Sequence, residues 1–327
     1  MNNTSLINPS KFVPHPATSS VGVESNSVIT HTVTRCRTKL TKQELTKQEL
    51  VDVQPLIDII KLTLQTAYIK GIETPVNLLI IAKPESVKTK ALEKFKIKGT
   101  FTTNNITSHS IAYKILPMIE SKSLKHLIIP DFLNAVEKDS RTAKSTINLF
   151  KILIEEGVTS LDQFYIKTDH VYKPPVKCGL ITGITTKGYY GEYNPATQRT
   201  EGGVKNYWRN IGFLSRLVPF TYKYELSKIR KVMEYIENEE HEKPLEKEKL
   251  KYKVSEVKGN SELFKQLEIV SMTVGSKIDA YGFRLQRDLQ YLAKANAVLR
   301  DDNEVTQEDI EKVLYLSNWI NYDFNIL

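Results

Sequence analysis

The stretch AKPESVKT, from Ala82 to Thr89, follows an apolar run and precedes a segment with helical spacing. A phosphate-binding loop has the pattern G-x-x-x-x-G-K-[ST]. Its glycines let backbone N–H groups turn toward phosphate, its lysine neutralises charge and its hydroxyl binds magnesium. Lys88 and Thr89 match the two functional side chains. The octet therefore predicts a nucleotide-binding loop, formed by Pro84, Glu85, Ser86, Val87, Lys88 and Thr89.

Both glycine positions of this loop are substituted, by Ala82 and Val87. A β-branched residue at positive φ is strained, and its methyl groups crowd the approach of a phosphate oxygen. Glu85 would add repulsion against phosphate. We therefore expect weak nucleotide binding. The alternative interpretation is a solvent-exposed loop that contains a chance Lys-Thr pair.

A carboxylate follows the next apolar run of this kind, HLIIPDF, which begins at His126 and contains Asp131. The second strand of a phosphate-binding core presents such a carboxylate to magnesium. Thr89 and Asp131 are therefore the predicted magnesium ligands, and the alternative for Asp131 is a turn residue at a strand end. Phe132 stands where hydrolysing enzymes of this type commonly carry a glutamate, so hydrolysis is expected to be slow or lost.

Near-continuous apolar runs alternate with amphipathic segments in the middle of the chain, which predicts an α/β fold with helices on both faces of a parallel sheet. The runs Val76–Ile81, His126–Ile129 and Gly179–Ile184 are expected to lie side by side. The predicted division is a flexible N-terminal arm over 1–40, an α/β core over 41–236, a charged linker over 237–260 and a small all-helical piece over 261–327.

Several blocks in this order resemble those of the AAA+ P-loop ATPases, most closely the minichromosome-maintenance helicase branch. They are AKPESVKT, LIIPDF, CGLITGIT with a following Gly-Tyr turn, GFLSRLVPF, FRLQRDLQYLAKANAVLR and VTQEDIEKVLYL. The resemblance runs from about Gln54 to the C-terminus. It implies a nucleotide-binding α/β core, a helical lid formed by the C-terminal piece, and ATP and Mg²⁺ as cofactors.

The resemblance also implies roles for three further residues. Arg216 falls on the arginine that reaches the γ-phosphate of a neighbouring subunit. Thr185 falls on the polar residue of the sensor-1 strand, where the branch usually has Asn, and Arg284 falls on sensor 2. The alternative is that Arg216 is a surface residue paired to an acid and Arg284 a residue on a helix face.

The segment from Thr185 to Asn210 interleaves aromatic and basic residues between glycines. Aromatic rings beside cations are typical of surfaces that hold single-stranded nucleic acid without sequence preference. The chain carries a formal net charge of +8 and has a pI of about 9.1, which fits a polyanionic partner. The alternative is that the rings fix a long loop to the core. The predicted nucleic-acid contacts are Lys187, Tyr189, Tyr190, Lys205, Trp208 and Arg209.

These features predict an AAA+-type ATP-binding protein that acts as a homo-oligomer in a DNA transaction, such as replication of a mobile element or a prokaryotic genome. One alternative is a catalytically degenerate relative that serves as a non-hydrolysing scaffold or DNA-binding subunit, beside an active AAA+ paralogue. Another is an unrelated α/β protein. The two cysteines lack the spacing of a zinc site or disulfide framework, and no secretory signal or membrane-spanning run is present, so a cytoplasmic location is expected.

Overall fold

The structure is a computed structural model that describes residues 53–136, 140–162, 166, 170–195, 199–238 and 245–324. The described residues all belong to one compact unit, residues 46–327. The predicted arm over 1–40 lies outside the described residues. Among the helices of the described residues, none combines the length and the apolar character that crossing a bilayer requires.

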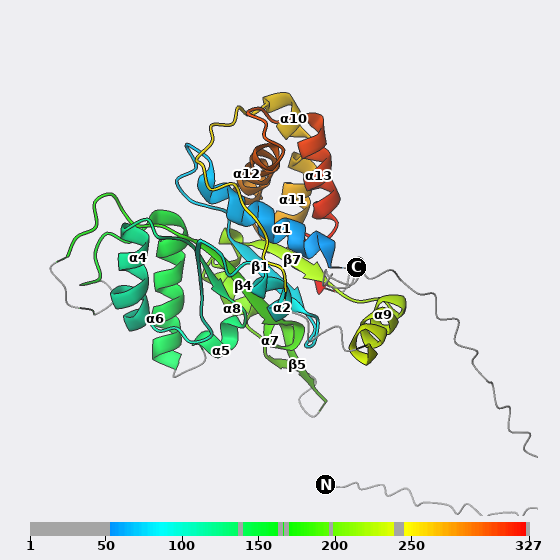
Figure 1. The fold of residues 1–327 in the computed structure, drawn as a ribbon. Coiled ribbons are helices and arrows are strands. Elements are labelled where there is room, and N and C mark those ends of the chain that lie inside the picture. Colours follow the sequence, from blue (N-terminus) through cyan, green and yellow to red (C-terminus); the bar gives the residue numbers. More distant parts are fainter. Residues whose placement is uncertain are drawn as a thin grey trace, which may run out of the picture. The chain divides into compact units, whose positions relative to one another are not determined.

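A parallel sheet of five strands occupies the centre of this unit (Figure 1). Its strand order is β2-β3-β4-β1-β7, and every neighbouring pair is parallel. All residues of β1 and β7 are buried, as expected for strands covered on both faces. The predicted α/β fold with three adjacent parallel strands is confirmed. The strands are β1 (Leu78–Ala82), β2 (Gly99–Thr102), β3 (Leu124–Ile129), β4 (Gly179–Thr185) and β7 (Val218–Tyr222).

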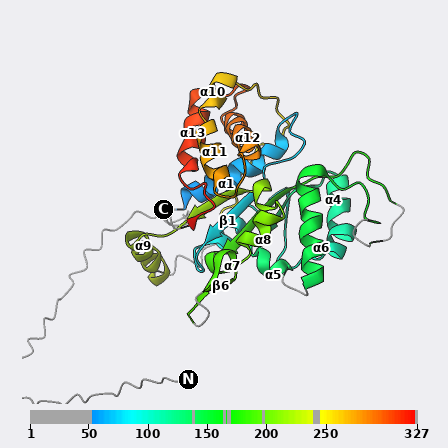
Figure 2. The ribbon, with the colours of Figure 1, turned by 180° about the vertical axis from the view of Figure 1, so that it is seen from behind.

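Short helical segments connect β1, β2, β3 and β4, which follow one another in the chain. Helices α4 and α6 lie side by side, as the opposite views in Figures 1 and 2 both show. Their apolar faces supply fully buried residues such as Leu116, Leu149 and Phe150 to the core. The segments are α2 (Lys88–Glu93), α3 (Ser108–Ser110), η3 (Ile111–Ile115), α4 (Leu116–Glu120), α5 (Phe132–Val136), α6 (Ser140–Lys151) and η4 (Ile152–Glu156).

The neighbouring strands β1 and β4 send the chain in opposite directions. The connection after β1 leads past β4 and β3 to β2, whereas the connection after β4 leads past β1 to β7. Ligands of open α/β sheets bind beyond the carboxyl ends of the strands at such a switch point. The residues that follow β1 and β4 are therefore the first place to look for a site.

A small hairpin and three short helical segments connect β4 to β7. Strands β5 and β6 pair antiparallel and extend away from the sheet at the bottom of Figure 1. The elements are α7 (Thr186–Tyr190), β5 (Gly191–Asn194), β6 (Arg199–Gly202), α8 (Lys205–Asn210) and η6 (Leu214–Arg216).

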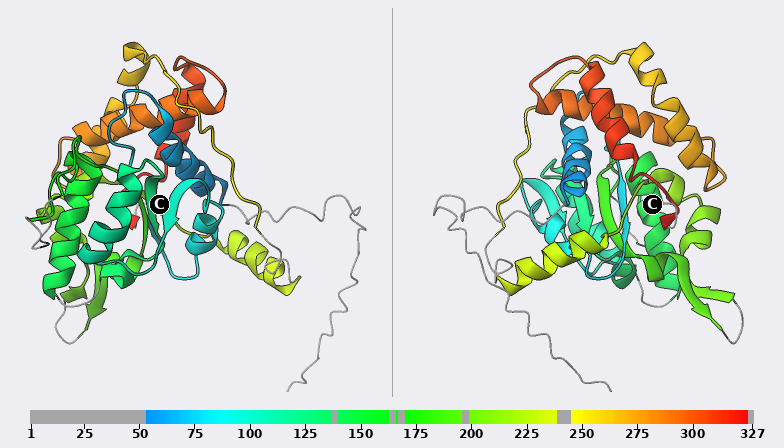
Figure 3. Two further views of the ribbon diagram at one scale, coloured as in Figure 1. Left: turned by 60° about the vertical axis from the view of Figure 1, so that its left-hand side comes forward. Right: turned by 90° about the vertical axis from the view of Figure 1, so that its right-hand side faces the viewer.

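The C-terminal part is a group of helices packed against the N-terminal helix α1 (Figure 3). The long helix α12 lies at its centre and contacts α1, α11 and α13 through fully buried residues such as Leu289 and Leu292. Helix α13 begins after Thr306, which forms a capping box with Asp309. The elements are α1 (Gln54–Gln65), η2 (Thr66–Tyr68), α10 (Ser261–Lys265), α11 (Glu268–Ser276), α12 (Phe283–Leu299) and α13 (Gln307–Ser317).

Residues 245–260 of the predicted charged linker form an extended strap along α1 and η2. The Gln65 side chain bonds both backbone groups of Lys251, at 2.8 and 3.0 Å, and Ser255 forms a parallel bridge with Ile69. Leu250 of the strap is buried. These contacts fix the strap to α1 and η2, so the charged composition of this segment does not make it a free spacer.

Helix α9 (Leu226–Glu237) follows β7 and stands apart from the other helices in Figures 1 and 3. Its sequence is amphipathic, with apolar residues at helical spacing. Four of these apolar side chains are nevertheless exposed: Leu226, Ile229, Met233 and Ile236.

Candidate functional site

The loop between β1 and α2 has the backbone shape of a glycine-containing turn although it contains no glycine. Glu85 and Val87 have φ of 59° and 63°, and Val87 directly precedes α2 in the left-handed conformation. Left-handed valine is a backbone outlier, with a cost of about 1–3 kcal/mol. The surrounding structure therefore holds the loop in a conformation that its sequence disfavours.

Lys88 holds this loop from the inside. Its ammonium donates hydrogen bonds to the Ala82 and Lys83 carbonyl oxygens, both at 3.0 Å, and to Ser86 Oγ at 3.1 Å. These contacts engage all three donors of the ammonium. Burial lowers the pKa of Lys88 to about 8, and the Asp131 carboxylate acts in the opposite direction.

The end of strand β7 supports the loop from the other side. The Tyr222 hydroxyl donates a hydrogen bond to the Ser86 carbonyl oxygen, and Tyr224 Oη donates to the same oxygen at 3.4 Å. Burial raises the pKa of the Tyr222 hydroxyl, so this group remains a donor in ordinary conditions. Ser86 and Lys88 are buried, whereas Pro84, Glu85 and Thr89 are exposed.

A glycine in β4 allows the ends of β3 and β1 to come close to one another. A Cβ atom at Gly183 would lie 2.4 Å from the Pro130 carbonyl oxygen and 3.8 Å from Lys88 Cδ. Pro130 directly precedes Asp131. The sheet thus brings Lys88 and the Asp131 segment to the same carboxyl edge, as the sequence predicts.

Asp131 and Thr185 both bond local backbone or side-chain groups at this edge. The Asp131 carboxylate accepts a hydrogen bond from Asn134 Nδ2 at 2.9 Å at the start of α5. This local contact is the one expected of a turn residue at a strand end, the alternative interpretation of Asp131. Thr185 Oγ1 accepts from the Gly188 N–H at 3.1 Å and caps α7. They line a common hollow of about 390 Å³, whose other lining residues are Leu133, Asn134, Lys187, Gly188, Gly191, Glu192 and Gly202.

Phe132 lies in the core and not in this site. It is fully buried, with ring centroids 5.5 Å from Phe150, 5.2 Å from Trp208 and 5.7 Å from Phe213. The position next to Asp131 therefore presents no group to the hollow. The sequence shows that Phe132, and not a carboxylate, follows Asp131, but the cluster of four aromatic rings appears only in three dimensions.

The prediction that Trp208 and Tyr189 stack with bases is wrong for this structure. Both side chains are fully buried, so no base can reach their faces. Trp208 packs edge-on against Phe132 and Phe213, and Tyr189 packs edge-on against Tyr190. The alternative interpretation, in which these rings fix the segment to the core, describes their role.

Tyr190 and Lys205 are also engaged within the chain. The Tyr190 hydroxyl donates to the Tyr322 carbonyl oxygen at 3.0 Å and accepts from the Phe324 N–H at 2.5 Å. Lys205 Nζ lies 2.5 Å from Asp323 Oδ1 and 5.1 Å from the centre of the Tyr190 ring. These contacts join the segment after β4 to the end of the described chain.

The remaining two predicted nucleic-acid contacts, Lys187 and Arg209, are exposed. Lys187 forms an ion pair with Glu192 at 2.6 Å, and both side chains remain about two-thirds exposed. Such a pair is weak in water, so it leaves Lys187 able to meet another anion.

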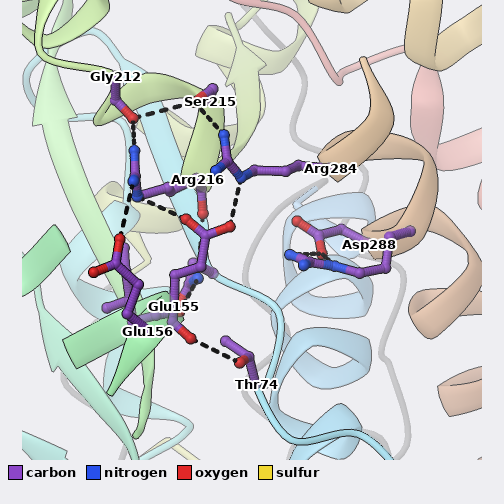
Figure 4. A network of polar contacts seen from close by, with 11 residues as sticks. Thr74, Glu155, Glu156, Gly212, Ser215, Arg216, Arg284 and Asp288 are labelled. Atoms are coloured by element: carbon purple, nitrogen blue, oxygen red, sulfur yellow. Dashed lines mark hydrogen bonds and ion pairs between the residues drawn. The ribbon is translucent and has the colours of Figure 1, made fainter. Parts of the chain in front are cut away.

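Arg216 and Arg284 share one carboxylate (Figure 4). Arg216 Nε lies 2.7 Å from one oxygen of Glu155, and Arg284 Nε lies 2.5 Å from the other. Arg216 also lies 3.7 Å from Glu156, and Arg284 donates to Ser215 Oγ at 3.3 Å. Both arginines are thus paired to an acid within their own chain.

This cluster lies at the amino edge of the sheet. Glu155 belongs to the segment before β4, and Arg216 lies two residues before β7, whereas the Lys88 loop follows β1. Five strand residues at about 3.3 Å each separate the two edges by about 17 Å. Neither arginine can therefore complete the Lys88 site of its own chain.

No family model matches the sequence, and a search of curated proteins finds no match.

Asp288 of α12 is a buried carboxylate beside the arginine cluster (Figure 4). It accepts hydrogen bonds from Arg287 at 3.1 and 3.2 Å. Burial raises its pKa to about 7, with Arg287 opposing the shift. The folded protein therefore holds a proton here, between about pH 4 and 7, that the unfolded chain releases.

Replacing Val87 by Gly should raise the free energy of unfolding by about 1 kcal/mol, because relief of the left-handed strain exceeds the entropic cost of glycine. Urea unfolding measures the change. Val204 is the matched control, since it is also half-buried and directly precedes a helix but has φ of −92°. Val204→Gly should lower the stability, and equal effects of the two substitutions would contradict the strained-loop interpretation.

Replacing Asp288 by Asn should stabilise the protein more at pH 8 than at pH 4. The wild-type chain loses stability as the pH rises from about 4 to 7, since its folded state binds more protons than its unfolded state, and the amide removes this loss. The gain should level off above pH 7, at a few kcal/mol or less. Denaturant unfolding across this range tests it, with Glu304→Gln as the exposed control; a pH-independent gain would refute the assignment.

Proposed function

We propose that the protein is an AAA+-type nucleotide-binding subunit that holds ATP and magnesium at the Lys88 loop and hydrolyses ATP slowly or not at all. The observation that carries this proposal is the loop itself. Its left-handed residues and its buried lysine lie at the switch point of a parallel sheet, the usual ligand position of such folds.

The residues present fit a nucleotide phosphate. Left-handed residues within a short turn direct successive backbone N–H groups to one side, which favours anions. Lys88 would neutralise the phosphate charge, and Thr89 and Asp131 would hold magnesium with phosphate oxygens and water. Phosphate must first displace the Lys88 ammonium from its three internal bonds, which supports weak binding.

Buried Phe132 supports the non-hydrolysing alternative. Hydrolysis of this kind needs a group that orients water, and the residue after Asp131 faces an aromatic core. Glu85 is exposed in the loop and carries the wrong charge for contact with phosphate. An active AAA+ paralogue in the same assembly could supply the missing carboxylate at a site of its own.

The arginine cluster supports a head-to-tail homo-oligomer. Arg216 and Arg284 come from the α/β core and the helical group, the proposed lid, and meet at the edge opposite the Lys88 loop. In a heterologous assembly this edge can face the loop of the next copy. The ion pairs of Arg216 and Arg284 with Glu155 would then have to break before the arginines could contact the phosphate.

The test is a titration of the protein with ATP and magnesium. Lys88→Ala should weaken binding at least tenfold because it removes the only buried cation of the loop, and Val87→Gly should tighten binding several-fold. Lys90→Ala is the control, since Lys90 is an exposed lysine of the same helix. Equal affinities of the Lys88→Ala and Lys90→Ala variants would refute the proposed site.

Nucleic acid is the proposed polyanionic partner, in a cytoplasmic DNA transaction. Lys187 precedes the β5–β6 hairpin in the chain and Arg209 follows it, and both are exposed. The hairpin extends from the body in Figure 1. These two cations and the net charge of +8 of the whole chain support binding to phosphate backbones.

Binding to a single strand should therefore weaken as salt increases. Replacing both Lys187 and Arg209 by Ala should reduce the slope of log affinity against log salt by about 1.4, if each meets one phosphate. Fluorescence anisotropy at several salt concentrations measures this slope. The control is a double variant of exposed Lys90 and Lys70, on other elements. An unchanged slope in the first variant would exclude this surface.

A further inference from the structure

The hollow beside Asp131 and Thr185 contains a second carboxylate, which comes from the β5–β6 hairpin. Glu192, the second residue of β5, lines this hollow of about 390 Å³ together with Asp131 and Thr185. A water molecule takes up about 30 Å³ in the liquid, so the hollow has room for a phosphate group and several waters. Leu133 is the one apolar side chain among its described lining residues, and the others are polar residues or glycines. Water can therefore enter the hollow and contact a phosphate there.

Glycines keep the hollow open beside Glu192. The first paired residues of the hairpin are Gly191 and Gly202, and both line the hollow. Neither has a side chain that could fill the space next to the carboxylate. A third lining glycine, Gly188, lets α7 approach α5, since a Cβ atom there would lie 2.3 Å from Leu133 Cδ1. The wall of the hollow thus leaves Glu192 free to meet a molecule inside it.

The hollow adjoins the Lys88 loop, where the last phosphate of a bound nucleotide would be held. The Lys88 side chain runs past Gly183, because a Cβ atom at Gly183 would lie 3.8 Å from Lys88 Cδ and 2.4 Å from the Pro130 carbonyl oxygen. Gly183 is two residues before Thr185, and Pro130 directly precedes Asp131. A phosphate that contacts the Lys88 ammonium therefore lies next to the hollow.

The hairpin itself gives no structural reason for a glutamate at position 192. In the register of the hairpin, Glu192 is paired with Glu201, and like charges at opposite positions of two antiparallel strands are destabilising. Among the described residues, Glu192 forms an ion pair with Lys187, but both side chains are about two-thirds exposed, so the pair adds little stability. A residue that breaks a local rule without a structural gain is a candidate for a role in function.

We propose that Glu192 orients and deprotonates the water that attacks ATP, the task that buried Phe132 cannot perform. This inference rests on the proposed function, because it requires ATP at the Lys88 loop. A carboxylate oxygen of Glu192 accepts a proton from water while the water oxygen bonds to the γ-phosphorus. The bond between the γ-phosphorus and the β–γ bridging oxygen breaks, and ADP leaves with the electron pair of that bond. Glu192 then releases its proton to the solvent.

The ion pair with Lys187 makes a carboxylate acceptable next to a triphosphate. The Lys187 ammonium lies 2.6 Å from the Glu192 carboxylate, so the pair as a whole brings no net charge to the phosphate. The exposure of Glu192 also agrees with slow hydrolysis. An exposed side chain keeps several rotamers, so the carboxylate is in position to meet the water for only part of the time.

ATP hydrolysis and ATP binding, measured separately, test this role. Glu192→Gln keeps the size of the side chain but removes the proton acceptor, so phosphate release should fall about a hundredfold while ATP affinity stays unchanged. In a single-turnover mixture, the bound nucleotide should become ADP in the wild type and remain ATP in the variant. Glu73→Gln is the control and should change neither quantity. Glu73 also pairs with a lysine, Lys177 at 3.6 Å, but it precedes β1 at the opposite edge of the sheet.

Formate provides a further measurement that a purely structural role would not affect. Glu192→Ala opens space at the wall of the hollow, so added formate should restore hydrolysis several-fold in this variant and leave the wild type and Glu73→Gln unchanged. A Glu192→Ala variant that binds ATP normally but is not rescued would count against the role of the carboxylate.

Equal hydrolysis by the wild type and Glu192→Gln would overturn the inference. A loss of ATP affinity in Glu192→Gln that matches its loss of hydrolysis would also overturn it, because Glu192 would then act in binding. ATP binding without hydrolysis in the wild type would refute the role of Glu192 and leave the nucleotide proposal intact. A wild-type protein that does not bind ATP would refute the proposed function itself, and this inference with it.

Discussion

The hydrogen bonds from the Lys88 ammonium to its own loop are the interaction on which the site depends. A buried ammonium needs acceptors, because an unpaired charge away from water is strongly destabilising. The carbonyl oxygens of Ala82 and Lys83 supply them only when the chain curls around the lysine. This requirement offers a physical reason for the left-handed Val87: the strain of one residue is smaller than the cost of leaving the charge unpaired.

Glu155 plays a similar part at the other edge of the sheet. Two guanidinium groups from separate parts of the unit would repel each other at this distance, and the carboxylate between them removes that repulsion. The same pairing holds α12 against the α/β core beside η6. Any ligand that draws the arginines away must therefore compete with an internal anion, just as any anion that draws Lys88 away from its loop must compete with internal carbonyl groups.

The sequence predicts the sheet well because its strands are buried on both faces and read as unbroken apolar runs. It also places Lys88 and Asp131 at one edge, since the carboxyl ends of parallel strands coincide. It does not predict that Trp208 and Tyr189 are buried, because aromatic residues between glycines and cations have the same spacing in a binding loop and in a packed one. The partner of Arg216 and Arg284 is equally hidden, since Glu155 lies 61 and 129 residues away from them. The charged composition of residues 245–260 also does not predict the strap, because the Lys251 backbone that fixes this segment bonds to the Gln65 side chain.

The cluster of Phe132, Phe150, Trp208 and Phe213 limits how this chain could change over evolutionary time. A single codon change that put glutamate at position 132 would place a carboxylate among three aromatic rings, at a penalty comparable with the total stability of a domain. The neighbours would have to become smaller or polar first, and each such step alone would open a void. A glutamate at position 132 is therefore separated from the present sequence by several substitutions, each of which alone destabilises the core.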